Sequence, residues 1–195
     1  KLGEGPGAGT RRPTSHARLL PAPGFLKDDQ IHFMALPFYE SGKKVKHPVT
    51  ESDVKITMEL LQKVKPHQIF AAGDFADPHG THITCFNIIL EAMRRLRETE
   101  EWTKDCWLWM YRGAWQEFET HEIEMAVPLS PQEVLRKRMA IFQHQSQKDV
   151  PVFPGDDERE FWVRAEERNR ETAVNYHRLG LAEYEAIEAF VRWNF

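Results

Sequence analysis

The chain has 195 residues, of which 41% are hydrophobic and 29% are charged, enough for one domain with a sizeable core. Its 26 basic and 30 acidic residues are interleaved and give a net charge of -4. This argues against a nucleic-acid-binding protein, which would carry clustered basic residues. No apolar run approaches the ~18 residues of a membrane-spanning helix, and no secretory signal is visible. With only Cys85 and Cys106, we expect a cytoplasmic protein without disulfides.

Residues 1–24 differ from the rest of the chain. They are rich in glycine, proline and basic residues and show neither a strand nor a helix period. We therefore predict an irregular or disordered leader. Residues 25–195 are expected to form an α/β domain, because apolar runs alternate there with amphipathic helical patterns.

The first part of this domain predicts a strand–helix–strand unit. Gln30–Leu36 is short and apolar, as expected of a buried strand. Thr50 and Asp53 are placed to begin a helix that extends to Lys65. His67–Ala72 follows as a second apolar strand. A strand–helix–strand crossover almost always joins parallel strands, so a mostly parallel sheet is predicted.

The later elements follow from the same signals. The predicted elements are a helix over Ile83–Arg97, strands at Asp105–Tyr111 and Ile123–Leu129, and a helix from a Ser130 cap to about His144. Asp156 or Asp157 is expected to cap a long helix that ends near Leu179, before Gly180. The pattern of Ile187–Trp193 is compatible with a strand or a short helix.

The stretch Gly73–His82 carries two histidines, two aspartates and two glycines where a strand leads into a helix. Ligands of open α/β sheets bind at that edge. Imidazole and carboxylate are common zinc ligands, so we predict part of a metal or catalytic site. His79 and His82 would share one helical face if the helix has begun by then. Asp77 has an alternative role as a helix cap.

The same stretch resembles a known family. Asp77–His82 resembles the second signature of the PIG-L/LmbE family of zinc-dependent de-N-acetylases, a His-x-x-His after a strand. Ile141–Gln147 resembles that family's helix ending in His-x-Ser-Gln. Residues 30–195 look most similar to the PIG-L-like domain at the C-terminus of bacterial proteins named glucosamine-6-phosphate deaminases. The segments that carry this closer resemblance are Leu36–Glu40, Tyr111–Glu117 and Ala189–Trp193.

The resemblance implies a three-layer, Rossmann-like fold and specific residue roles. His82 would ligate zinc. His79 would stabilise the oxyanion formed when water attacks an acetamide. Asp77 is a further candidate for a catalytic role. Arg112 and His144 are the candidates for substrate binding. For Arg112 a structural ion pair is an equal alternative, and for His144 the alternative is a helix-end contact.

One family signature is absent. The His-Pro-Asp-Asp-Glu segment that supplies the other ligands and the general base does not occur, and His47–Thr50 lacks the required acids. A catalytic zinc needs about three protein ligands, so the zinc site is expected to be incomplete. We therefore expect the C-terminal portion of such a domain, without its N-terminal strands. A bare sheet edge would then favour a homo-oligomer or pairing with the N-terminal portion.

Three functional hypotheses follow. The first is the C-terminal part of a metal-dependent hydrolase that removes acetyl from an N-acetylglucosamine-type sugar, with little or no activity on its own. The second is a non-catalytic module appended to a glucosamine-6-phosphate deaminase-like protein. The third, independent of any family, is a hydrolase with a self-contained metal site made by Asp74, Asp77, His79 and His82.

Overall fold

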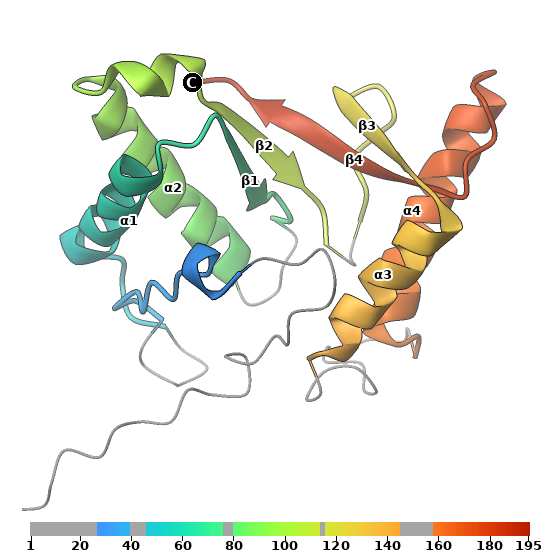
Figure 1. Cartoon of the computed structure of the whole chain (residues 1–195), viewed down its shortest axis with the longest axis horizontal. Helices are drawn as coiled ribbons and strands as arrows, with labels where there is room; N and C mark the ends of the chain where they lie inside the picture. Colours follow the sequence, from blue (N-terminus) through green and yellow to red (C-terminus); the bar gives the residue numbers. More distant parts are fainter. Residues whose placement is uncertain (1–26, 40–45, 76–79, 114–115, 145–157) are drawn as a thin grey trace, which may run out of the picture.

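The computed structural model describes residues 27–39, 46–75, 80–113, 116–144 and 158–195 (Figure 1). These ranges form a mixed α/β fold. Its helices and strands are α1 (Glu51–Val64), β1 (Gln68–Ala72), α2 (Thr81–Arg97), β2 (Trp107–Tyr111), β3 (Met125–Leu129), α3 (Pro131–Phe142), α4 (Phe161–Arg178) and β4 (Ala186–Trp193). Two short 3-10 helices are η2 (Asp28–Gln30) and η3 (Glu101–Asp105). The predicted leader, residues 1–24, lies outside the described ranges.

The four strands form one sheet in the order β1-β2-β4-β3. β1 and β2 pair in parallel and are joined by α2, as a strand–helix–strand crossover requires. β4 pairs antiparallel with both β2 and β3. β1, β2 and β3 therefore share one direction, and β4 is inserted between β2 and β3 in the opposite direction. Ile187–Trp193, whose sequence was compatible with a strand or a short helix, is therefore a strand and belongs to β4.

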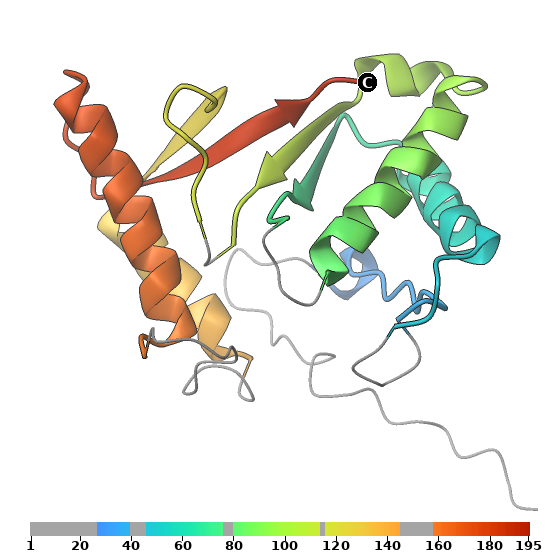
Figure 2. The same ribbon diagram turned by 180° about the vertical axis from the view of Figure 1, so that it is seen from behind.

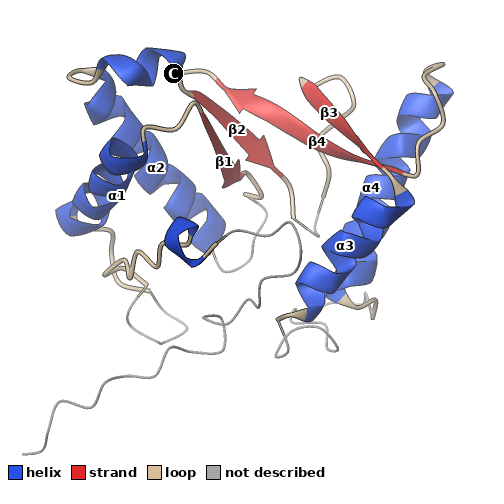
Figure 3. Ribbon diagram, in the orientation of Figure 1, coloured by secondary structure: helices blue, strands red, loops and turns tan. Residues whose placement is uncertain are grey.

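The sheet differs from the prediction of mostly parallel pairing. Only the β1–β2 pair is parallel, so the α/β class is confirmed and a Rossmann-like parallel sheet is not. The difference arises from β4, because the chain returns from α4 into the middle of the sheet. Helices flank the sheet, with α1 and α2 beside β1, and α3 and α4 beside β3 and β4 (Figures 2 and 3).

The sequence prediction of a strand at Gln30–Leu36 was wrong. η2 occupies Asp28–Gln30, and residues 31–36 have no regular secondary structure. Phe33 in this run is 68% exposed. A strand requires a neighbour for its backbone hydrogen bonds, and within the described ranges no strand pairs with the outer side of β1.

The buried anchor of this region is instead Phe38, whose amide donates to the Asp53 carboxylate (2.9 Å). Asp53 also accepts from the backbone amide and the hydroxyl of Thr50, both at 2.8 Å, as predicted for the start of α1. Burial by itself raises the pKa of Asp53, but these hydrogen bonds outweigh it and hold the pKa below its ordinary value. The carboxylate thus ties residue 38 to the first turn of α1.

We expect Asp53 to make the fold acid-sensitive. Because its pKa is lower folded than unfolded, its stabilising contribution is complete above the unfolded pKa of about 4 and is lost as the pH falls through the folded pKa. Urea unfolding between pH 6 and pH 2 should show a shallower loss of stability for Asp53→Asn than for the wild type. The exposed Asp105→Asn variant is the control. Parallel curves for all three proteins would contradict the prediction.

The other helix starts and ends follow local sequence signals. At the start of α3 the Ser130 amide donates to the Glu133 carboxylate (2.7 Å) and the Glu133 amide donates to the Ser130 hydroxyl (3.3 Å), which confirms the predicted capping box. α4 begins later than predicted, with Glu160 as its N-cap; residues 156 and 157 lie outside the described ranges. Gly180, with φ +92°, ends α4 as predicted.

The core lies between α2 and one face of the sheet. It joins Phe86 of α2 to Ala71 of β1, Leu108 and Met110 of β2, and Ala189 of β4. Further along α2, Met93 and Leu96 are also fully buried. Among the described helices, none combines the length and apolarity that crossing a lipid bilayer requires.

Gly73 allows β1 and β2 to meet closely where they end. Its amide donates to the carbonyl oxygen of Tyr111 (2.8 Å). A Cβ at residue 73 would lie 2.6 Å from the Cβ of Met110, which is closer than packed carbon atoms approach. The position therefore requires glycine for reasons of space.

We predict that Gly73→Ala lowers the free energy of unfolding by about 1–3 kcal/mol, the usual cost of overpacking a core. Urea unfolding would measure this. Gly180→Asn serves as a comparison for backbone strain alone, because nothing lies within 4 Å of a Cβ there while its φ of +92° disfavours side chains. Equal stability of Gly73→Ala and the wild type would show that β1 and β2 can separate without cost.

Candidate functional site

The candidate site lies at the edge of the sheet where the parallel strands end. β1 leads into Gly73 and Asp74, and β2 leads into Arg112 and Gly113. The Asp74 side chain is fully buried. A Cβ at Gly113 would lie 3.3 Å from Oδ2 of Asp74, so the loop after β2 passes directly against this carboxylate. The residues that follow β1 and β2 therefore meet at this edge of the sheet.

His82, the predicted zinc ligand, is half-buried in the first turn of α2. The N-cap of α2 is Gly80, with φ +65°, so the capping role considered for Asp77 belongs to Gly80. α2 begins at Thr81, so helical spacing does not extend back to His79. Asp77 and His79 themselves lie outside the described residues, and their catalytic roles remain predictions.

Arg168 of α4 brings a buried positive charge to this edge. Its guanidinium pairs with the Glu117 carboxylate at 2.9 Å, and the two side chains are only 11% and 16% exposed. Burial lowers the pKa of Arg168, whereas the nearby charges of Glu117, Glu188 and Asp74 act in the opposite direction. Burial likewise raises the pKa of Glu117 against the opposing effect of Arg168. The edge of the sheet is therefore a cluster of interacting, poorly hydrated charges.

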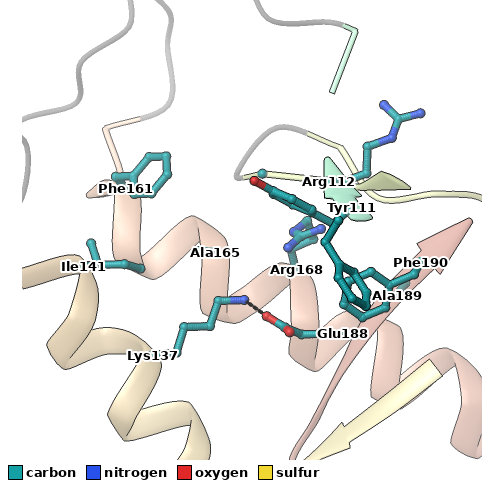
Figure 4. Close-up of a pocket in the computed structure, with 12 residues that line it drawn as sticks. Tyr111, Arg112, Lys137, Ile141, Phe161, Ala165, Arg168, Glu188, Ala189 and Phe190 are labelled. Atoms are coloured by element: carbon teal, nitrogen blue, oxygen red, sulfur yellow. Dashed lines mark hydrogen bonds and ion pairs between the residues drawn. The ribbon is translucent and has the colours of Figure 1, made fainter. Parts of the chain in front are cut away.

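The two residues predicted to bind substrate occupy different surroundings. Arg112 follows β2, lines a cavity and stacks over the ring of Phe118, with 4.5 Å from its guanidinium carbon to the ring centroid. In Figure 4 its guanidinium points away from Lys137 and Glu188. His144 is exposed beyond the end of α3 and does not line the cavity, whereas Lys137 and Ile141 of that helix do. The substrate-binding roles of Arg112 and His144 therefore stay predictions.

The cavity has a volume of about 410 Å³ and lies between the sheet and the α3–α4 pair. Its walls come from β1, β2, β4, α3 and α4. Lys137 of α3 forms an ion pair with Glu188 of β4 and donates to Asn169 of α4 (2.8 Å). Figure 4 shows this ion pair across the cavity, with Phe161 at one end and Tyr111 and Phe190 towards the other. Burial and the Glu188 charge raise the pKa of Tyr111, which favours its protonated, donating form.

Sequence reasoning missed Lys137, Arg168 and Glu188. For Lys137 and Arg168 a signal was present, because each lies on the inward stripe of its helix. Lys137 lies between Val134 and Ile141 on the inward stripe of α3, and Arg168 has the same position between Ala165 and Thr172 on α4. A charged residue on an inward stripe needs a partner, and here the partners come from distant segments.

A zinc site does not fit the described residues by themselves. Within the described ranges, no group of three or more His, Cys, Asp or Glu side chains could hold a metal ion. His82 and Asp74 could supply at most two ligands, whereas catalytic zinc needs about three protein ligands. Any complete metal site at this edge requires residues other than those described.

Comparison with known proteins finds one informative relative. No family model matches the chain. A protein of Bacteroides thetaiotaomicron, named a glucosamine-6-phosphate deaminase-like protein, is 55% identical over 166 residues. The match covers 85% of this chain and 25% of the relative, so the chain spans about a quarter of the relative's length. The relative's name agrees with the amino-sugar part of the sequence prediction, and membership of the PIG-L/LmbE family stays a prediction.

We predict that Glu117→Gln lowers the free energy of unfolding by about 3 kcal/mol, because it leaves the Arg168 charge buried without its carboxylate. Glu167→Gln is the matched control, since the Glu167–Arg159 pair is largely exposed and such pairs contribute at most about 1 kcal/mol. Urea unfolding of both variants checks this. Similar small losses for the two variants would show that the Arg168 charge is adequately hydrated.

Proposed function

We propose that this chain takes part in amino-sugar processing as the C-terminal portion of a PIG-L/LmbE-type de-N-acetylase, completed by residues outside the described ranges. The observation that carries the proposal is the 55% identity to a protein named for glucosamine-6-phosphate deaminase. The His-x-x-His of residues 79–82 adds the hydrolytic element of the proposal, since this signature resembles that family.

The geometry of the edge supports this chemistry. The 17-residue helix α2 begins at Thr81, so its positive dipole end lies at the turn that carries His82. Such a helix end favours negative charge, including the oxyanion that develops when water attacks an amide carbonyl. In the proposed role, His82 contributes one metal ligand and His79 faces the oxyanion. The remaining ligands would come from another segment.

The open side of β1 supports completion by a further segment. Within the described ranges, no strand pairs with its outer edge. Phe70 of β1 and Trp107 and Tyr111 of β2 lie on one face of the sheet, and 48%, 43% and 39% of their surfaces are exposed. An unpaired edge beside exposed aromatic rings is a surface that proteins usually cover. A strand from the N-terminal portion, or from a second copy, would cover it.

A second candidate is a non-catalytic module within a deaminase-like protein. It is favoured by the relative's name, which refers to a deaminase and not to a deacetylase, and by the match to only a quarter of that relative. On this hypothesis the charged edge would bind a sugar or a neighbouring domain without performing hydrolysis.

We expect the purified chain to hold less than one zinc ion per molecule and to release no acetate from N-acetylglucosamine above the level of His82→Ala. The longer B. thetaiotaomicron relative, measured in parallel, should hold zinc and release acetate, and its equivalent of His82→Ala should lose both. Elemental analysis and an acetate assay measure these outcomes. Zinc-dependent acetate release by the chain alone would show that the site is complete, and inactivity of the relative would favour the non-catalytic module.

A further inference from the structure

The cavity between the sheet and the α3–α4 pair combines apolar walls with positively charged side chains. Its volume of about 410 Å³ lies within the range of small-molecule pockets. Phe70, Phe161 and Phe190 supply aromatic rings, and Phe70 and Phe190 meet edge to face with ring centroids 5.3 Å apart. Of the described residues in the lining, Glu188 is acidic and three are basic, namely Arg112, Lys137 and Arg168.

The carboxylates around these basic residues limit how much negative charge the cavity can accept. Glu188 pairs with Lys137, and Glu117, which does not line the cavity, pairs with Arg168 at 2.9 Å. Asp74 lies against Gly113, and its charge also acts on Arg168. The basic residues of the lining attract an anion, whereas the nearby carboxylates disfavour a ligand with more than about one negative charge.

Arg168 carries hydrogen-bond donors that the described residues do not use. Its Nη1 donates to Glu117, and Nη2 has no acceptor among the described residues. Nε, on the same edge of the guanidinium as Nη2, is buried and also lacks a hydrogen-bond partner there. Figure 4 shows Arg168 between Tyr111 and the Lys137–Glu188 ion pair. Because buried donors without acceptors cost free energy, this edge of the guanidinium favours a ligand that supplies acceptors.

Another arginine of this protein shows what the same edge of a guanidinium binds. Arg138 of α3 donates through Nε and Nη2 to the two carboxylate oxygens of Glu166, at 2.6 and 2.7 Å. Arg168 has the same pair of N–H groups, and no carboxylate of the described residues occupies them. The two oxygens of a carboxylate match this pair in spacing and charge. A carboxylate that reaches Nη2 from the cavity would therefore lie next to Nε.

We infer that this cavity binds a small organic acid, with its single carboxylate on the Nε–Nη2 edge of Arg168 and its apolar body against the rings of Phe161 and Phe190. The inference does not rest on the proposed function, because this ligand is not the sugar considered there. A phosphate monoester would also match the guanidinium, but its second charge would face the nearby carboxylates. A purely apolar ligand would leave the Arg168 donors without acceptors.

Ligands of matched shape test the inference on the wild-type chain. Isothermal titration and saturation-transfer NMR, both in the presence of EDTA, should detect binding of phenylacetate. Phenylacetamide has the same ring without the charge, and acetate has the charge without the ring. Each should bind about tenfold more weakly than phenylacetate, since each lacks one of the two contacts. This comparison requires no variant, so it decides the question even where a substitution prevents folding.

Variants of two arginines in α4 locate the carboxylate. Arg168→Lys keeps a positive charge for Glu117 but removes the paired N–H groups, so phenylacetate should bind about tenfold more weakly and phenylacetamide equally well. Arg170→Lys is the matched control, because Arg170 is also ion-paired but does not line the cavity. It should bind phenylacetate within about twofold of the wild type. Circular dichroism confirms that each variant is folded.

The inference is overturned if phenylacetate does not bind, if phenylacetamide binds as tightly, or if Arg168→Lys and Arg170→Lys bind phenylacetate alike. Tighter binding of phenyl phosphate would also reject it, because the cavity would then prefer a dianion. Displacement of phenylacetate by equimolar N-acetylglucosamine would assign the cavity to a sugar instead. EDTA removes zinc and no turnover is measured, so these outcomes do not depend on whether the longer relative releases acetate.

Discussion

The close approach of β1 and β2 at their carboxyl ends determines the rest of the candidate site. The Gly73 amide bonds the Tyr111 carbonyl, and the absence of a Cβ at residue 73 lets Met110 fill the space above it. Because the two strands run in parallel, the residues that follow them emerge at one edge. Asp74 thus lies against Gly113, and α2 follows along the chain, beginning at Thr81. A chain that lost this contact would lose the position of the carboxylate and the helix end together.

Charged side chains connect this edge to the second half of the chain. Arg168 links α4 to Glu117 in the loop after β2, and Lys137 links α3 to Glu188 in β4. Partly buried pairs of this kind add little net stability when compared with apolar packing, but they penalise any arrangement that separates the partners. Their contribution is therefore to geometry. They fix where the α3–α4 pair sits relative to the sheet, and with it the width of the aromatic cavity.

Local sequence signals predicted the elements well and their pairing less well. Thr50 with Asp53 and Ser130 with Glu133 are short-range capping patterns, so the starts of α1 and α3 followed directly from the sequence. The reversed direction of β4 could not be predicted, since it depends on how α4 returns to the sheet. The strand end that carries Asp74 was singled out from the sequence as a ligand-binding edge, and that role stays a prediction. Arg168 was not singled out, because its partner Glu117 is 51 residues away and helical spacing records only neighbours on the same helix.

The placement of β4 has a consequence for how the protein acquires its structure. β4 is the last strand in the described sequence, yet it lies between β2 and β3. While the polypeptide is being synthesised, β3 has no partner in the sheet until residues 186–193 have left the ribosome. The β1–α2–β2 unit can assemble early from nearby contacts, whereas the remainder depends on pairing across long sequence separations, which is slow. The nascent chain should consequently pass through a stage in which α3, α4 and β3 have been synthesised but cannot yet pack against β4.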